Sequence, residues 1–298
     1  MKYSYNMIDF LNAGSSIEIV PSDRLFLIFL LYSFIGWCCE VLYVGIFYEH
    51  KFINRGFLHG PICPIYGCGG LIVMQLPPEV KSSWLTLFVS AMVLCSAVEY
   101  FTSWEMERMF KMKWWDYSDH KFNIKGRICL LNSVLFGIMG IVAVHFVQPV
   151  VDHFVFMLSD TLTVYLSSGL AVVFIIDIII TVHKLVDFST AMAKIKEFGE
   201  SLTERYSEET WFQGASMTEM FSSIKERAAV EKGRFSKKIL QKIDFFNEHR
   251  PSEERFLIRF PGLSSTSYRE SLGLVKQHIM DEIAEKKAAL SMKKHKSE

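Results

Sequence analysis

The sequence predicts an all-α membrane protein, a polytopic bundle of five transmembrane spans followed by a helical cytoplasmic tail. Half of the 298 residues are hydrophobic and the mean hydropathy is +0.22, whereas a soluble protein of this size covers itself with polar surface. Five apolar stretches are long enough to cross a bilayer, which takes about 20 helical residues. Charge gathers near the C-terminus, since residues 184–298 hold 21 of the 32 basic and 18 of the 32 acidic side chains. An ordinary soluble enzyme is excluded.

The five expected spans lie within a transmembrane domain of residues 1–183. They cover residues 25–47, 57–76, 84–103, 128–147 and 162–182. The second is the weakest, because Pro61, Pro64 and four glycines interrupt it. Lipid cannot satisfy the backbone groups that such a break frees, so we expect this span to be broken or to line the protein interior. The first span is long and has no small-residue cleavage site after it, which argues against a cleavable signal peptide.

Basic residues near the span ends predict the orientation, because cytoplasmic loops are enriched in lysine and arginine. The loop after the third expected span carries six basic residues from Arg108 to Arg127, and the loop after the first carries Lys51 and Arg55. Residues 149–161 carry none. We therefore expect a multi-pass protein of the plasma membrane, with its N-terminus outside and its tail, residues 184–298, in the cytoplasm.

Three carboxylates, those of Glu40, Glu99 and Asp177, lie inside expected spans toward the cytoplasmic side. Charge at bilayer depth is costly, so such residues usually face the bundle interior or an aqueous path. Arg55 and Arg127 begin the following spans near the same depth, and a guanidinium can hold a carboxylate through two hydrogen bonds. One hypothesis is a polar cluster that forms a substrate or ion pathway facing the cytoplasm. The other is a set of ion pairs that only stabilises the fold.

The loop after the third expected span is rich in aromatic residues. Trp104, Trp114 and Trp115 predict an aromatic belt that anchors this loop at the inner membrane surface. In the alternative interpretation the loop gates a substrate or partner. The polar residues that would make those contacts are Asp116, Tyr117, Asn123 and Arg127.

Neither a cofactor nor a metal site is expected from the sequence. All six cysteines fall inside the apolar spans, and the chain has no nucleotide-binding glycine loop, HExxH metal motif or nucleophile elbow. If ATP is used, another chain must bind it. The balance of 32 basic against 32 acidic residues excludes a strongly basic nucleic-acid binder, so no nucleic-acid partner is expected.

The tail favours amphipathic helices, because apolar residues recur three and four positions apart among charged ones. The pattern covers residues 192–203, 217–246 and 268–292. The most apolar part of the tail, residues 255–263, is expected to dock against another helix.

Four groups of residues carry a resemblance to a known family. They are Gly36-Trp37 with Glu40, Arg55-Gly56-Phe57-Leu58 with Gly60-Pro61, Pro64-Ile65-Tyr66-Gly67, and Trp114-Trp115-Asp116-Tyr117-Ser118 with Asn123 and Gly126-Arg127. Together they resemble the ABC-transporter type IV (CmpB-like) membrane permease family, found mostly in Firmicutes. The resemblance covers roughly residues 25–150 and implies a bacterial plasma-membrane permease.

Three functions stay open at this point. The first is a permease or transporter component of unknown substrate, which lies in the lipid bilayer and takes a separate ATP-binding subunit or a second copy of itself as partner. The second is a non-catalytic membrane scaffold or sensor that recruits partners through its tail. The third, a membrane-embedded enzyme, is disfavoured because no convincing nucleophile or metal-ligand set is present, and we expect no enzyme.

Overall fold

The structure, a computed structural model, describes most of the chain. The described residues are 20–44, 54–209, 215–230, 237, 239–241, 243, 254–260, 262–277 and 279–280. The first 19 residues, the end of the first expected span and parts of the expected tail helices 217–246 and 268–292 lie outside them.

Apart from loops, the described residues form helices and no strands, which confirms the expected all-α class. The helices are α2 (Ser22–Val44), α3 (Pro64–Met74), α4 (Pro78–Ser82), α5 (Trp84–Phe110), α6 (Leu130–Val142), the π-helical turn η2 (Ala143–Val147), α7 (Gln148–Phe156), α8 (Asp160–Tyr206), α9 (Met217–Val230) and α11 (Glu254–Arg259). Within the described part of the chain, extended pairing is limited to two isolated bridges, Lys113 with Ser264 and Ile124 with Ile128.

Four helical stretches are long and apolar enough to cross a membrane. They are Ser22–Leu42, Trp84–Phe110, Leu130–Phe156 and Asp160–Tyr206, which contain four of the five expected spans in whole or in part. The second expected span is different, because only α3 is helical there, with 11 residues. At a rise of 1.5 Å per residue it is about 16 Å long, half of a bilayer core of about 30 Å.

The break in this span has a simple cause in its sequence. Residues 54–63 are not helical, and Pro61 and Pro64 have no backbone N–H to donate. Pro64 instead occupies the first turn of α3, where a missing N–H has no consequence because the helix offers it no acceptor. The expectation that this span is broken is therefore confirmed, while the number of membrane crossings stays a prediction.

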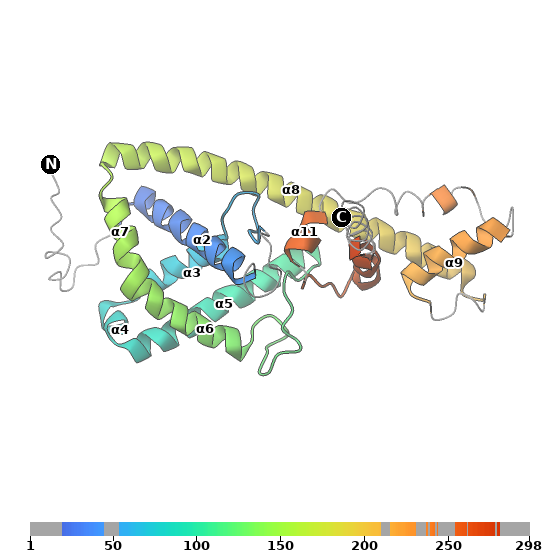
Figure 1. Cartoon of the computed structure of the whole chain (residues 1–298), viewed down its shortest axis with the longest axis horizontal. Helices are drawn as coiled ribbons and strands as arrows, with labels where there is room; N and C mark the ends of the chain where they lie inside the picture. Colours follow the sequence, from blue (N-terminus) through green and yellow to red (C-terminus); the bar gives the residue numbers. More distant parts are fainter. Residues whose placement is uncertain are drawn as a thin grey trace, which may run out of the picture.

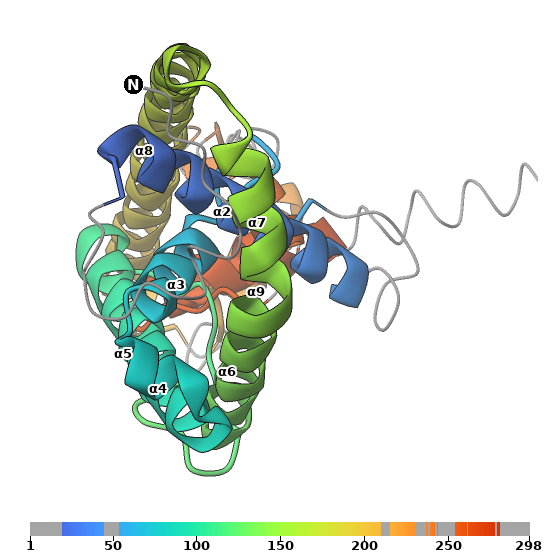
Figure 2. The ribbon, with the colours of Figure 1, turned by 90° about the vertical axis from the view of Figure 1, so that its left-hand side faces the viewer.

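The helices are arranged as a bundle with one long helix along its side. Figure 1 shows α2, α3, α5 and α6 packed together, with α8 lying along them and continuing past the bundle to α9. In Figure 2, which views the bundle from one end, α3 lies at its centre, among α2, α5 and the continuous helix of α6 and α7. The boundary expected after residue 183 lies inside α8 and stays a prediction.

Glycines allow the central helix to approach α2 closely. A Cβ atom built at Gly67 of α3 would lie 2.2 Å from Ser33 Oγ and 2.6 Å from the backbone oxygen of Phe29. Gly36 of α2 accommodates the ring of Tyr66 in the same way. Small residues at helix contacts are typical of membrane bundles, where van der Waals packing replaces the hydrophobic effect.

The π-helical turn between α6 and α7 comes from Pro149, which cannot donate a hydrogen bond to the preceding turn. The N–H of Gln148 therefore reaches back to the carbonyl of Ala143. The Tyr32 hydroxyl from α2 lies 2.8 Å from the side-chain oxygen of Gln148 and 3.5 Å from that same carbonyl oxygen. The Tyr32 hydroxyl thus lies within hydrogen-bonding distance of a backbone carbonyl in the widened turn.

The largest buried apolar cluster lies at the far end of α8, outside the bundle. Its members come from the second half of α8, from α9, from residues 110–114 and from the tail. The bundle helices instead expose apolar side chains on their outer faces, as expected for helices that contact lipid. Examples are Val89, Val93, Leu131, Ile138, Val173 and Ile176.

The close approach at Gly67 predicts a large difference between two neighbouring glycines. Gly67→Ala should destabilise the bundle by about 1–3 kcal/mol, because α2 backbone blocks the new methyl group. Gly69→Ala is the matched control, since a Cβ atom there would lie 3.5 Å from Cys95 Sγ, an ordinary contact. Thermal unfolding of the purified protein in detergent, followed by circular dichroism, measures both. Equal melting temperatures for the two variants would contradict this packing.

Candidate functional site

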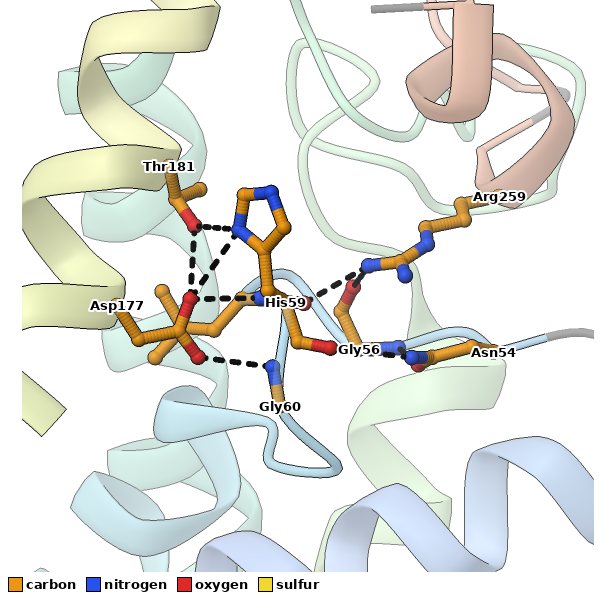
Figure 3. A network of polar contacts seen from close by, with 8 residues as sticks. Asn54, Gly56, His59, Gly60, Asp177, Thr181 and Arg259 are labelled. Atoms are coloured by element: carbon orange, nitrogen blue, oxygen red, sulfur yellow. Dashed lines mark hydrogen bonds and ion pairs between the residues drawn. The ribbon is translucent and has the colours of Figure 1, made fainter. Parts of the chain in front are cut away.

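A non-helical segment, residues 54–63, enters the bundle and is held by a carboxylate of α8. The Asp177 carboxylate accepts hydrogen bonds from the backbone N–H groups of His59 and Gly60, both at 2.8 Å (Figure 3). The imidazole Nδ1 of His59 lies 3.2 Å from Asp177 Oδ1 and 3.0 Å from the hydroxyl oxygen of Thr181. Asp177 therefore acts as the hydrogen-bond acceptor that lipid cannot supply to freed backbone donors.

The other side of this segment is held by the tail. One guanidinium nitrogen of Arg259, at the end of α11, donates to the carbonyl oxygens of Gly56 (2.9 Å) and Leu58 (2.8 Å). Arg55 in turn donates to the carbonyl oxygen of Arg259. The Asn54 side-chain oxygen accepts from the N–H of Gly56 at 2.9 Å (Figure 3). Donors and acceptors of the broken span are thus paired from two distant parts of the chain.

The two glutamates expected in a pathway lie toward the end of the bundle that carries the loop of residues 111–129, and each is bonded to a tyrosine. The hydroxyl of Tyr66 donates to Glu40 at 2.7 Å, and the hydroxyl of Tyr117 donates to Glu99 at 3.1 Å. Glu99 is only 6% exposed, and its second oxygen has no hydrogen-bond partner. The buried hydroxyl of Ser103, one turn further along α5, also has none. The second oxygen of Glu99 and the hydroxyl of Ser103 can therefore each form a further hydrogen bond inside the protein.

The arginines do not pair with these glutamates, which corrects the ion pairs considered from the sequence. Arg127 pairs with Glu107 near the end of α5, and its guanidinium lies 5.4 Å from the centre of the Tyr100 ring. Glu107 is eight residues beyond Glu99, about 12 Å along the helix. Arg127, near the end of the loop, thus contacts α5 about two helical turns beyond Glu99. Arg55 is turned toward the tail.

The loop of residues 111–129 is held by its own side chains. Asn123 accepts a hydrogen bond from the N–H of Gly126 and donates to the carbonyls of Ser118 and His120. Gly126 has φ of +67°, and a Cβ atom there would lie 2.4 Å from Asp116 Oδ1. Asn123 is therefore occupied in shaping a turn that requires glycine.

Asp116 joins this loop to the tail. Its carboxylate accepts from the N–H of Ser118 and the hydroxyl of Ser264, each at 3.1 Å. Burial alone would raise the pKa of Asp116, but these hydrogen bonds and nearby Lys113 hold that pKa below its ordinary value. Burial and the Glu99 carboxylate raise the pKa of Tyr117, which therefore stays a neutral donor.

The three tryptophans occupy different environments. Trp104 is 40% exposed, as an interfacial anchor must be. Trp115 is partly buried, and its indole N–H donates to the carbonyl of Arg127 at 2.9 Å. Trp114 is 3% exposed and packs against Phe57, Phe256 and Phe260, so it anchors the tail to the loops and does not reach lipid. Phe256 also packs against Phe188 of α8, with 6.4 Å between the ring centres, so the expected contact of this segment with another helix is present.

A second polar group lies nearer the opposite end of the bundle. Gln148, which accepts from Tyr32, donates in turn to Asp152 at 2.6 Å. Between this group and the glutamates, Val73, Leu87 and Ala91 are buried against one another. Closer to Glu99, the hydroxyl of the buried Ser96 donates to that of Ser133 at 2.7 Å.

Sequence reasoning missed His59, Thr181 and Arg259 as parts of the site. The proline and glycine content of residues 54–63 did signal that outside partners were needed. No local pattern says which distant side chains supply them. Within the described residues, no cluster of three or more histidine, cysteine, aspartate or glutamate side chains has the geometry to hold a metal ion.

Comparison with known proteins now decides the family. Residues 27–182, which are 156 of the 298 residues, match the family described as "Putative ABC-transporter type IV". The chain belongs to this family. This is a family of transporter components and not of enzymes, and the four membrane-length helices agree with a membrane protein. No curated protein and no solved structure matches the chain.

The role of Asp177 predicts that Asp177→Ala loosens residues 54–63. Two part-buried N–H groups would lose their acceptor, and each costs up to the roughly 1–3 kcal/mol of a fully buried unsatisfied donor. Cys63, which is 6% exposed, reports the opening, and its alkylation by a maleimide should speed up about tenfold or more, measured by mass spectrometry. Asp187→Ala is the control on the same helix, because Asp187 is exposed and pairs with His183. Unchanged labelling in both variants would refute this role.

A second prediction compares Arg127→Ala with Lys125→Ala. Arg127 is 11% exposed and paired, while Lys125 faces solvent. Removing one partner of a fully buried pair costs about 3–5 kcal/mol, against less than about 1 for an exposed charge. Because Glu107 is 25% exposed, Arg127→Ala should lie at or below the lower end of that range and still exceed Lys125→Ala. Equal, small shifts in a thermal-shift assay would count against the buried pair.

Proposed function

We propose that this protein is the membrane-embedded component of a transporter in a bacterial plasma membrane. The observation that carries the proposal is the broken second span. Broken helices at membrane depth commonly line transport sites, because unwound backbone is tolerated there only inside protein or along an aqueous cavity. Asp177 is 17 residues from the start of α8, about 25 Å along the helix, which supports a location of this segment within the bilayer.

In this proposal the chain crosses the membrane five times, with α3 and residues 54–63 together forming the second crossing. The N-terminus is then outside, and the tail, residues 184–298, is cytoplasmic. The basic loops, including residues 111–127, support this orientation.

The solute or ion path runs through the bundle between two polar groups. The inner group is Glu40, Tyr66, Glu99 and Tyr117, and the outer group is Tyr32, Gln148 and Asp152. The side chains packed between them, which include the cluster of Val73, Leu87 and Ala91, close the path in this structure. The unpartnered oxygen of Glu99 is the first candidate contact for a polar solute or a coupling ion. Asp116 and Asn123 shape the inner loop and have no direct part in the path.

Two partners belong to this proposal. A separate ATP-binding subunit is the partner that an ABC-type membrane component needs, and the cytoplasmic loops with the docked tail are the surface available to it. A second copy of the chain is the other partner, because α8 exposes apolar side chains on most of its membrane portion.

One observation keeps the scaffold or sensor function as a second candidate. The tail is hydrogen-bonded to both cytoplasmic loops, through Arg259 to residues 56–58 and through Ser264 to Lys113. A tail fixed in this way can report the conformation of the broken span to a bound partner. In that case the tail contacts carry the function and the glutamates only stabilise the bundle.

The transporter proposal predicts that Glu99→Gln abolishes function without loss of protein. In a strain that lacks the protein, wild type should restore the intracellular metabolite profile, and Glu99→Gln should not, because the amide cannot carry the charge that contacts the solute or ion. Glu79→Gln is the control, since Glu79 is an exposed glutamate of α4. Untargeted mass spectrometry of cell extracts measures the profile and immunoblotting the abundance.

The contrary outcome separates the two candidates. If Glu99→Gln restores the profile while Arg259→Gln, which breaks the tail contact, does not, the scaffold or sensor function replaces the transporter. Affinity purification from native membranes in mild detergent adds a second test. A stoichiometric ATP-binding subunit supports the ABC-type assembly, and recovery of the chain alone argues for a different energy source.

A further inference from the structure

A pocket of about 310 Å³ lies where the end of α5 meets the loop and the tail. Its lining residues are Trp104, Glu107, Arg108, Lys111, Arg127 and Ser267. Three of them are cations and one is an anion, so the pocket is electropositive. The bundle path of the proposed function lies elsewhere, and this pocket has no role in it.

The positive charge of this pocket is not neutralised by the protein. The carboxylate of Glu107 is engaged by Arg127, and the Nε atom of Arg127 is buried without a hydrogen-bond partner. The guanidinium of Arg108 is 68% exposed, and the carboxylate nearest to it, that of Glu105, is 3.9 Å away. Among the described residues, the Lys111 ammonium has no anionic partner. Lys111, and Arg108 beyond its long contact with Glu105, are therefore available to an anion from outside.

The neighbouring surface of α5 changes from apolar to charged in the direction of the cytoplasm. Phe101 is 59% exposed, and its ring centre lies 5.9 Å from that of Trp104. The Arg108 guanidinium lies 5.6 Å from the centre of the Trp104 ring. These residues share one helix face, because they are three and four positions apart. An exposed phenyl ring, an indole and a guanidinium thus follow one another toward the pocket.

This order matches the structure of a phospholipid at the inner membrane surface. Acyl chains contact apolar side chains, indoles lie at the level of the headgroups, and phosphates attract arginine and lysine. We propose that the pocket binds the phosphate of an anionic phospholipid of the cytoplasmic leaflet, with its acyl chains along the exposed Phe101. Arg108 and Lys111 bind the phosphate oxygens, and Arg127 lines the base of the pocket.

Binding there links the lipid to the tail. Ser267 follows the segment that docks on the loops, so a phosphate in the pocket contacts the bundle helix and the tail together. The lipid should therefore stabilise the docked tail.

The test uses the full-length protein, stripped of lipid in detergent and titrated with short-chain phosphatidylglycerol under native mass spectrometry. Wild type should bind it about tenfold more tightly than short-chain phosphatidylcholine. The double variant Arg108→Gln, Lys111→Gln should lose about tenfold or more of that affinity. The double variant Lys121→Gln, Lys125→Gln removes the same charge from exposed positions of the loop outside the pocket and should keep it. Unchanged melting temperatures without lipid verify that both variants fold.

Two outcomes would overturn the proposal. Equal loss of affinity in both double variants would mean that phosphatidylglycerol follows the general surface charge and not this pocket. Equally tight binding of glycerol phosphate or inorganic phosphate, which have no acyl chains, would make the ligand a soluble phosphate compound. Neither outcome bears on the transporter function, because Glu99 and the broken span are not involved.

Discussion

Backbone polar groups have no hydrogen-bond partner in lipid, and much of this structure follows from that constraint. Residues 54–63 cannot form a helix, so their donors and acceptors need partners from elsewhere in the chain. Asp177 supplies the acceptor and Arg259 supplies the donor. The charged residue inside α8 is thus required by the backbone of another span. Its place in an apolar helix has a structural reason independent of transport.

The same constraint links the membrane bundle to the tail. Arg259 binds residues 56–58, and Trp114 packs against aromatic residues on both sides of that contact. The tail and the broken span are therefore mutually dependent, and a movement of one has to break hydrogen bonds of the other. Such a connection is what a transporter needs to couple a cytoplasmic event to its membrane path, and what a sensor needs to report it.

The polar residues inside the bundle show what residue type alone predicts and what it does not. Glu40 and Glu99 do face protein partners, as a carboxylate in a span is expected to. Their partners are tyrosines and not arginines. A tyrosine hydroxyl satisfies a carboxylate oxygen without placing a second charge in the bundle, so the arrangement avoids the desolvation of a buried ion pair.

The sequence by itself predicted the all-α class, five spans of which four are long apolar helices in the structure, and the break in the second span. These features depend on composition, hydrophobic length and the backbone chemistry of proline, which are local properties. The family followed from the resemblance of short motifs, which the family match confirms. Only the tertiary structure decided that Asp177 binds His59 and Gly60, that Arg127 pairs with Glu107, and that Trp114 is buried under the tail. Those contacts join residues up to 146 positions apart, as between Trp114 and Phe260. A hydrogen-bonding or aromatic group in a sequence does not specify which distant partner the packing of helices brings to it.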